Sequence, residues 1–371
     1  MPHKKLINIL SCISAAAIFS ILIFSYYRDS LELPESFPAI SETPFYKNLQ
    51  EIDTSAVSAI VCDANSGEII YSENPNEKLP MASTTKIMTA LVVLENTSLD
   101  ETVTISEQSV GIEGSSIYLS KGETLTVEEL LYGLLLESGN DAAHALALYT
   151  GKSIDGFCLL MNEKAKALGL SSTNFENPHG LSSENHYTTA RELAVITSNA
   201  MKNDTFRKIV STTKYYIKGR EGCRERYFSN HNRLLKTLHD CVGVKTGYTK
   251  NSGRCLVSAT NKDDSTFITV TLNDRNDFND HKTLHTYAHN NFKTVLIAKK
   301  EELRYSIGHD TVFNNEDIYI TVKKDYEGPF SMQVDIDKNG NSDIGTVKIG
   351  FDGITRQFYL YTYDSIPNEN Q

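Results

Sequence analysis

The sequence predicts an α+β protein in which a β-sheet carries an inserted helical block and is followed by a small all-β domain. Short alternating segments at 56–62 and 68–72 predict a hairpin, and apolar segments between 83 and 169 predict helices. Residues 242–272 return to strand patterning, and after about residue 298 helical patterning fades. This order of elements is typical of a sheet with a helical subdomain.

The first 28 residues predict a membrane anchor or a signal segment. Lys4 and Lys5 precede an almost uncharged stretch at 6–24, close to the ~20 residues that cross a bilayer. No small-residue cleavage site follows, which favours an uncleaved anchor. We expect a single-pass protein of the cell membrane with an extracytoplasmic catalytic domain, or a secreted protein if the segment is cleaved. Residues 29–50, which contain three prolines, predict a linker.

The net charge argues against nucleic-acid binding, whereas the cysteines do not decide the function. The net charge of the 371 residues is −11, with no basic surface of the kind that nucleic-acid binding requires. Five cysteines follow the N-terminal segment, and none forms a Cys-x-x-Cys metal motif. Cys223 and Cys241 could form a disulfide, and free thiols are an equally good interpretation.

Within the helical block, residues 87–94 are apolar nearly all round, which predicts a buried central helix beginning near Ser83. A capping box at 126–129 opens the next helix, which stops at Ser138-Gly139-Asn140-Asp141. We expect two further helices, the first ending at Leu148 and the second spanning 155–168. The strands expected after the helical block are 242–249, 255–260, 267–272, 318–322 and 358–362.

The first candidate for chemistry is Ser83-Thr84-Thr85-Lys86. A serine needs a base within hydrogen-bond reach, and a lysine three residues later on a helix shares its face. Burial in an apolar helix and a second cation lower the pKa of such a lysine, and Lys245 could supply this cation. The pattern alone is weak, because Ser211-Thr212-Thr213-Lys214 repeats it. We interpret that copy as a strand, which would place its Ser and Lys on opposite faces.

Two further motifs strengthen the first. Ser138-Gly139-Asn140 lies in a tight loop between two apolar helices, and Lys245-Thr246-Gly247 lies on an expected strand. Three motifs on a helix, a loop and a strand, in this order, are known from penicillin-binding proteins and class A β-lactamases.

The sequence resembles the low-molecular-mass penicillin-binding proteins, specifically the D-alanyl-D-alanine carboxypeptidases. Segments 177–181, 188–192 and 243–249 add to the likeness, which covers about residues 50–297. The resemblance implies that residues 51–297 form a β-lactamase/transpeptidase-like domain, an antiparallel sheet with a helical subdomain. Residues 298–371 would form the C-terminal β-domain.

The resemblance also implies roles in catalysis. Ser83 would attack the carbonyl between the two terminal D-alanines of a peptidoglycan stem peptide, and Lys86 would take its proton. Ser138 and Lys245 would pass a proton to the departing D-alanine, and Asn140 would bind the substrate amide. β-Lactams would acylate the same serine as inhibitors.

Substrate binding is expected on the third motif. Lys245 and Thr246 would bind the terminal carboxylate, and Gly247 would let the substrate approach the strand closely. The backbone N–H groups of Ser83 and Tyr248 would form the oxyanion hole. No cofactor is expected.

Other readings of the sequence stay open or are set aside. A D,D-endopeptidase or weak transpeptidase would use the same residues, and a non-catalytic penicillin-binding scaffold would be expected to have lost one motif. A β-lactamase is disfavoured, because no Glu-x-x-Leu-Asn segment lies between residues 140 and 245.

His281, His285 and His289 could face a metal, but an exposed amphipathic helix end is the preferred interpretation. Residues 335–340 resemble the start of a calcium loop and fit an Asn-Gly hairpin better.

Overall fold

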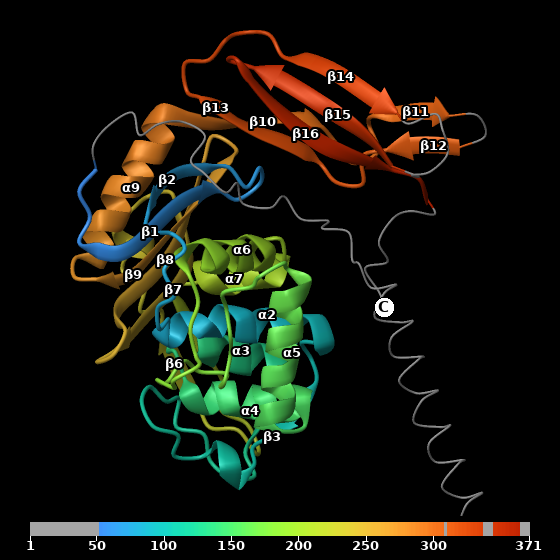
Figure 1. Ribbon diagram of the computed structural model, residues 1–371. Helices are drawn as coiled ribbons and strands as arrows, with labels where there is room; N and C mark the ends of the chain where they lie inside the picture. Colours follow the sequence, from blue (N-terminus) through green and yellow to red (C-terminus); the bar gives the residue numbers. More distant parts are fainter. Residues whose placement is uncertain (1–51, 308–309, 337–343, 364–371) are drawn as a thin grey trace, which may run out of the picture. The chain divides into compact units, whose positions relative to one another are not determined.

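The structure is a computed structural model that describes residues 52–307, 310–336 and 344–363 (Figure 1). The expected anchor at 1–28 and linker at 29–50 lie outside these residues, as does the turn within 335–340. Among the residues described, no helix has both the length and the apolar character needed to cross a bilayer.

The central sheet is five-stranded and antiparallel throughout, with the order β2-β1-β9-β8-β7. The hairpin near the N-terminus therefore pairs with strands from about 200 residues later. This arrangement confirms a sheet with an inserted helical block. Its strands are β1 (Ala56–Asp63), β2 (Ile69–Glu73), β7 (Cys241–Thr249), β8 (Gly253–Lys262) and β9 (Ser265–Asp274).

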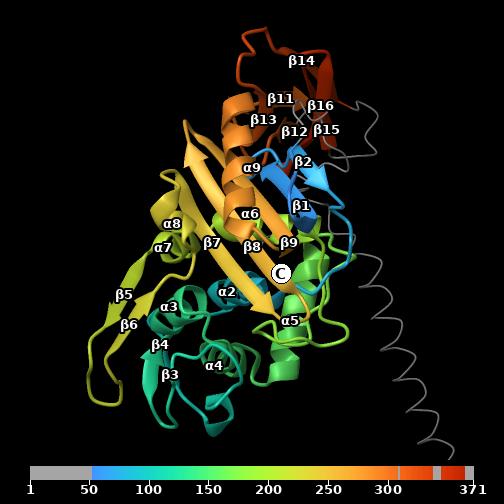
Figure 2. The same ribbon diagram turned by 90° about the vertical axis from the view of Figure 1, so that its left-hand side faces the viewer.

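Helices cover both faces of this sheet (Figure 2). α9 (Asp277–Asn291) packs on β8 and β9 from one side, and the inserted helices lie on the other. The inserted helices are η1 (Ala82–Thr85), α2 (Lys86–Asn96), η2 (Glu107–Ser109), α3 (Val127–Leu136), α4 (Asn140–Gly151), α5 (Ile154–Ala167), α6 (Ala190–Met201), α7 (Asp204–Ser211) and α8 (Leu234–Thr237). Two short sheets, β3 (Thr102–Thr104) with β4 (Thr124–Thr126) and β5 (Lys214–Ile217) with β6 (Arg226–Ser229), lie within this part.

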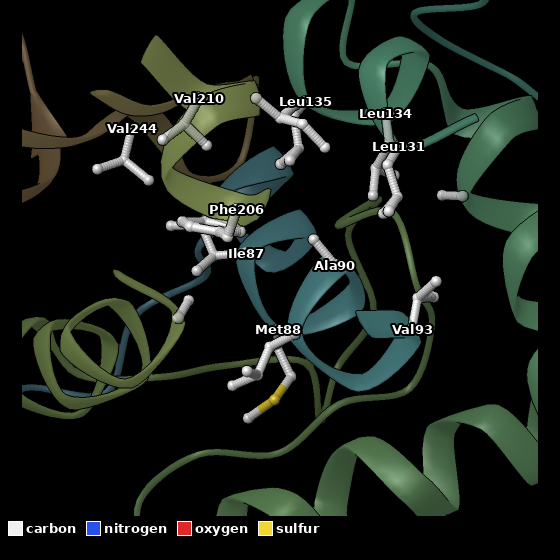
Figure 3. Packing of buried hydrophobic residues seen from close by; sticks show 14 of the residues in the cluster. Ile87, Met88, Ala90, Val93, Leu131, Leu134, Leu135, Phe206, Val210 and Val244 are labelled. Carbon is white, nitrogen blue, oxygen red and sulfur yellow. The ribbon is translucent and has the colours of Figure 1, made fainter. Parts of the chain in front are cut away.

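Helix α2 lies at the centre of the largest apolar core (Figure 3). All eight residues from Lys86 to Val93 are buried, because helices pack around α2 on several sides. Leu131 and Leu135 of α3 and Phe206 of α7 belong to the same core. The prediction of a buried central helix is confirmed, and this burial is what desolvates the lysine at its start.

The capping box predicted for α3 is present. The Thr126 side chain accepts from the Glu129 N–H, and the Glu129 side chain accepts from the Thr126 N–H. These bonds satisfy N–H groups that a helix start leaves without partners. They fix the start of α3, and the loop that contains Ser138 follows the other end of this helix.

The remaining strands form two further sheets. β10 pairs with β13, and five strands have the order β11-β12-β16-β15-β14. Val347, Ile349 and Leu360 alternate toward a separate apolar core, as expected from the period of two. The strands are β10 (Phe292–Ala298), β11 (Arg304–Ile307), β12 (Asp310–Phe313), β13 (Ile318–Lys323), β14 (Ser331–Ile336), β15 (Ile344–Phe351) and β16 (Ile354–Tyr361).

The interpretation of the three histidines as an exposed helix end is wrong. His281 and His285 are fully buried between α9 and the sheet. The Ser258 hydroxyl lies 2.6 Å from a ring nitrogen of each, and Thr260 lies 2.8 Å from His285 and from His289. Sheet hydroxyls thus satisfy the imidazoles. No group of three metal-ligating side chains occurs within the residues that the structure describes.

The cysteines of the described residues all carry free thiols. Cys223 and Cys241 are therefore not joined, and the free-thiol interpretation holds.

Candidate active site

Ser83 and Lys86 meet at the junction of η1 and α2. Lys86 Nζ lies 3.0 Å from Ser83 Oγ. The same nitrogen lies 2.7 Å from Asn140 Oδ1 and 2.6 Å from the carbonyl oxygen of His179. Ser83 therefore lies in the 3₁₀ turn that leads into the helix, and the lysine is the first residue of the α-helix itself.

These contacts orient the lysine amine. An amide oxygen and a backbone carbonyl can only accept hydrogen bonds. A neutral amine has two N–H groups and one lone pair, so Asn140 and His179 take both N–H groups. The lone pair is then left for the third neighbour, Ser83 Oγ. Neutral Lys86 is thus arranged to accept the serine proton.

Burial favours the neutral form of this amine. Lys86 is fully buried, and burial lowers its pKa well below the ordinary range of a lysine. The positive charge of Lys245 lowers the pKa of Lys86 further, and the carboxylate of Asp141 raises it. The second cation proposed from the sequence is therefore the one that acts on Lys86.

The loop between α3 and α4 carries the second motif. Ser138 is buried at φ +62, in the left-handed region, and Asn140 begins α4. Asn140 Nδ2 donates to the carbonyl of Glu113 at 2.6 Å, which fixes its Oδ1 toward Lys86. Asn140 of the second motif therefore contacts the lysine of the first.

Strand β7 passes directly against the serine. A Cβ added to Gly247 would lie 2.9 Å from the Ser83 backbone nitrogen and 3.1 Å from Ala82 Cβ, so only glycine fits without displacement. Thr246 and Tyr248 flank it, and the Tyr248 side chain is 65% exposed. Asn140 of the second motif and Gly247 of the third thus both lie at the pair formed by Ser83 and Lys86.

Lys245 is the second buried lysine of the site. It is 1% exposed, and burial lowers its pKa to about 7. Its Nζ donates to the carbonyl of Thr246 at 2.9 Å. A substrate carboxylate placed beside it would supply an opposite charge and raise its pKa again.

Sequence reasoning gave no role to the segment 177–181, which the structure places beside the lysine. The His179 carbonyl accepts from Lys86, and Gly180 packs so closely that an added Cβ would lie 1.9 Å from the Ala82 carbonyl oxygen. Gly180 also has φ +90, a conformation that favours glycine. Gly180 was the signal in the sequence that could have indicated a turn at this segment.

The second Ser-x-x-Lys copy has a different geometry. Ser211 is the last residue of α7, whereas Lys214 is the first residue of β5. The strand interpretation is therefore correct for Lys214 and wrong for Ser211. A helix end separates the two side chains, and Ser211 Oγ donates to the carbonyl of Lys208.

The arrangement defines a class of protein: an active-site-serine peptidase with a buried lysine base. Residues 45–276 match the family described as D-alanyl-D-alanine carboxypeptidase. The chain therefore belongs to this family of serine peptidases. The predicted family, fold class and serine-type D-Ala-D-Ala carboxypeptidase assignment are confirmed at the level of the family.

Relatives in sequence carry the same description. The chain is 37% identical over 230 residues to the D-alanyl-D-alanine carboxypeptidase DacF of Bacillus subtilis (strain 168), covering 60% of this chain and 59% of that protein. It is 28% identical over 389 residues to DacA of Escherichia coli (strain K12), covering 95% of this chain and 91% of DacA. The first match therefore spans less than two thirds of the length of DacF.

Solved structures share the fold. Penicillin binding protein 5 from Haemophilus influenzae is 26% identical with a TM-score of 0.73, covering 85% of this chain and 98% of its own. A mutant of the Streptomyces K15 DD-transpeptidase is 34% identical with a TM-score of 0.61, covering 64% and 98%. The first of these also spans part of the chain beyond the peptidase match, since it covers more than the 45–276 segment.

Proposed function

We propose that this protein removes the terminal D-alanine from peptidoglycan stem pentapeptides through an acyl-enzyme at Ser83. The observation that carries the proposal is the set of acceptors around Lys86, which leaves its lone pair facing Ser83 Oγ. A serine is a competent nucleophile only when such a base takes its proton.

In the first half-reaction, Ser83 Oγ bonds to the carbonyl carbon of the penultimate D-alanine while Lys86 takes the hydroxyl proton. The backbone N–H groups of Ser83 and Tyr248 are assigned to the developing oxyanion. The C–N bond then breaks, and the proton that Lys86 took from Ser83 passes through Ser138 and Lys245 to the nitrogen of the departing D-alanine. Water attacks the resulting ester in the second half-reaction and restores the serine.

Substrate selection is assigned to β7 and to Asn140. Lys245 and Thr246 would bind the terminal carboxylate, and the remaining N–H of the Asn140 amide would bind the substrate carbonyl. Gly247 supports this assignment, because its lack of a side chain keeps the strand close to Ser83. The carboxylate would raise the pKa of Lys245 from about 7 and keep it protonated for transfer to the leaving group.

We further propose that the chain has four parts: a membrane anchor at 1–28, a linker at 29–50, the peptidase at 51–297 and a C-terminal β-domain at 298–371. The peptidase would then act on the outer side of the cell membrane, where peptidoglycan lies. Sedimentation with membranes, compared between the full chain and a chain starting at residue 29, tests the anchor. Equal sedimentation of both would contradict it.

The activity is tested by measuring D-alanine release from a pentapeptide ending in D-Ala-D-Ala. We expect release by the wild type, none by Ser83→Ala, and wild-type release by Ser211→Ala, which alters the second copy of the motif. A crosslinked dimer peptide, supplied in parallel, identifies a D,D-endopeptidase if it is the only substrate cleaved. Labelling of Ser83 by a fluorescent penicillin without turnover of either substrate would identify a scaffold.

A further inference from the structure

A carboxylate next to the second motif holds a loop at the edge of the site. Asp141 follows Asn140 in the first turn of α4 and is 1% exposed. Its Oδ1 accepts from the backbone nitrogens of Ile117 and Ala142, at 3.0 and 2.9 Å. Its Oδ2 accepts from the Leu119 nitrogen at 3.0 Å and from Ser116 Oγ at 2.6 Å. One side chain thus binds the segment 116–119 to the start of α4 through one hydroxyl and two backbone N–H groups.

The same loop in turn holds Asn140. The Ser115 carbonyl accepts from the Asn140 backbone nitrogen at 2.7 Å, and the Glu113 carbonyl accepts from its Nδ2 at 2.6 Å. Gly114 lies so close that an added Cβ would be 2.7 Å from Nδ2. The segment 113–119, which we call the clamp loop, is therefore bound to Asp141 at one end and to Asn140 at the other.

The clamp loop keeps a conformation that its own sequence does not favour. Tyr118 has φ +59, although a bulky residue rarely adopts the left-handed region. Its neighbours on both sides donate to Asp141, and its carbonyl accepts from Arg224 Nη2 at 2.5 Å. Tertiary contacts therefore impose this backbone, as is common where geometry serves function.

We propose that Asp141 is a positioning residue for the acylation step, acting through the clamp loop to fix the amide of Asn140. An amide fixed with Nδ2 on Glu113 must present Oδ1 to Lys86, which engages one N–H of the amine. The lone pair is thereby held on Ser83. This inference rests on the proposed function of Ser83 and Lys86, and it assigns Asp141 no contact with substrate.

Asp141→Asn tests the inference with a change of a single group. The asparagine side chain has one accepting oxygen, whereas the carboxylate has two. One of the two backbone N–H groups, of Ile117 or of Leu119, would then face the NH2 group of the asparagine instead of an acceptor. We expect the loop to detach and the second-order rate of Ser83 acylation by a fluorescent penicillin to fall by about 10²-fold, the usual effect of a misplaced catalytic group. The matched control is Asp155→Asn, which removes an exposed first-turn carboxylate from α5 and should acylate like the wild type.

A pH profile separates positioning from general destabilisation. The charge of Asp141 raises the pKa of Lys86, so its removal lowers that pKa. We expect the acid limb of the acylation profile of Asp141→Asn to move to lower pH and that of Asp155→Asn to stay in place. Rates are divided by the amount of folded protein. An unshifted limb with a wild-type rate would overturn the inference.

Two further measurements keep the inference testable in every case. If Asp141→Asn does not fold, Ser116→Ala removes the contact of Ser116 Oγ with Asp141 Oδ2 and the hydrogen bond that Oγ accepts from the Tyr118 nitrogen. An unchanged acylation rate in that variant would refute the role of the loop. If the wild type is not acylated, a crystal structure of Asp141→Asn decides, since an unmoved Asn140 amide would refute it. Wild-type acylation without D-alanine release would instead count against the carboxypeptidase proposal alone.

Discussion

Replacing Lys245 with methionine is expected to stabilise the folded protein while abolishing D-alanine release. The side chain is 1% exposed, and burial lowers its pKa to about 7 from an ordinary 10.5. The unfolded chain therefore binds a proton at Lys245 more tightly than the folded protein does. Folding at neutral pH must work against that difference, and methionine, which has a similar length and no charge, removes it.

The size of the effect depends on pH in a way that can be worked out. A difference of 3.5 pKa units corresponds to about 5 kcal/mol, which is the full cost below pH 7. Between pH 7 and 10.5 the folded protein has lost the proton and the unfolded chain has not, so the cost shrinks as pH rises. At pH 9 about 2 kcal/mol remains. The stability advantage of Lys245→Met should therefore fall by about 3 kcal/mol between pH 6 and pH 9.

Urea unfolding of the wild type and of Lys245→Met at pH 6 and pH 9 measures this change. The lost hydrogen bond to Thr246 subtracts about 1 kcal/mol at both pH values, so it leaves the difference between them unaffected. Lys250→Met, at an exposed lysine beside the end of the same strand, is the control and should show no such dependence. A constant advantage, or one that grows with pH, would refute the reasoning.

Three further outcomes are expected. Gly247→Ala, whose Cβ would lie 2.9 Å from the Ser83 nitrogen, should acylate about 10²-fold more slowly with an unchanged circular dichroism spectrum, and a wild-type rate would contradict the close approach. Ser258→Ala removes the hydroxyl that lies 2.6 Å from a ring nitrogen of His281 and of His285, so the free energy of unfolding measured in urea should fall by about 1–3 kcal/mol. An unchanged free energy of unfolding would mean that water replaces the hydroxyl. Burial lowers the pKa of His285 to about 3, so the unfolded chain binds more protons below about pH 6.5. Stability should drop by about 2 kcal/mol from this group between pH 6.5 and 5, and His285→Gln should show a smaller drop.

The sequence by itself determined the features that depend on local periodicity and composition. The apolar residues after Lys86 predicted a buried central helix, and Thr126 with Glu129 predicted the start of α3, as the structure has them. The order of the three motifs along the chain was enough to indicate the family. Each of these signals is carried by neighbouring residues, so no knowledge of the tertiary path was required.

Tertiary structure alone decided which distant groups meet at the lysine. Asn140 is 54 residues from Lys86 and His179 is 93, and the sheet order and loop paths that join them have no local signature. The same holds for the clamp formed by Asp141 and for the burial of His281, which its helical spacing alone suggested to be exposed. Periodicity shows which face of an element is apolar, whereas the partner of a polar group depends on what packs against that face. The sequence shows that a lysine follows Ser83 at position 86, but the lowered pKa and the hydrogen-bond partners of this lysine exist only in the folded protein.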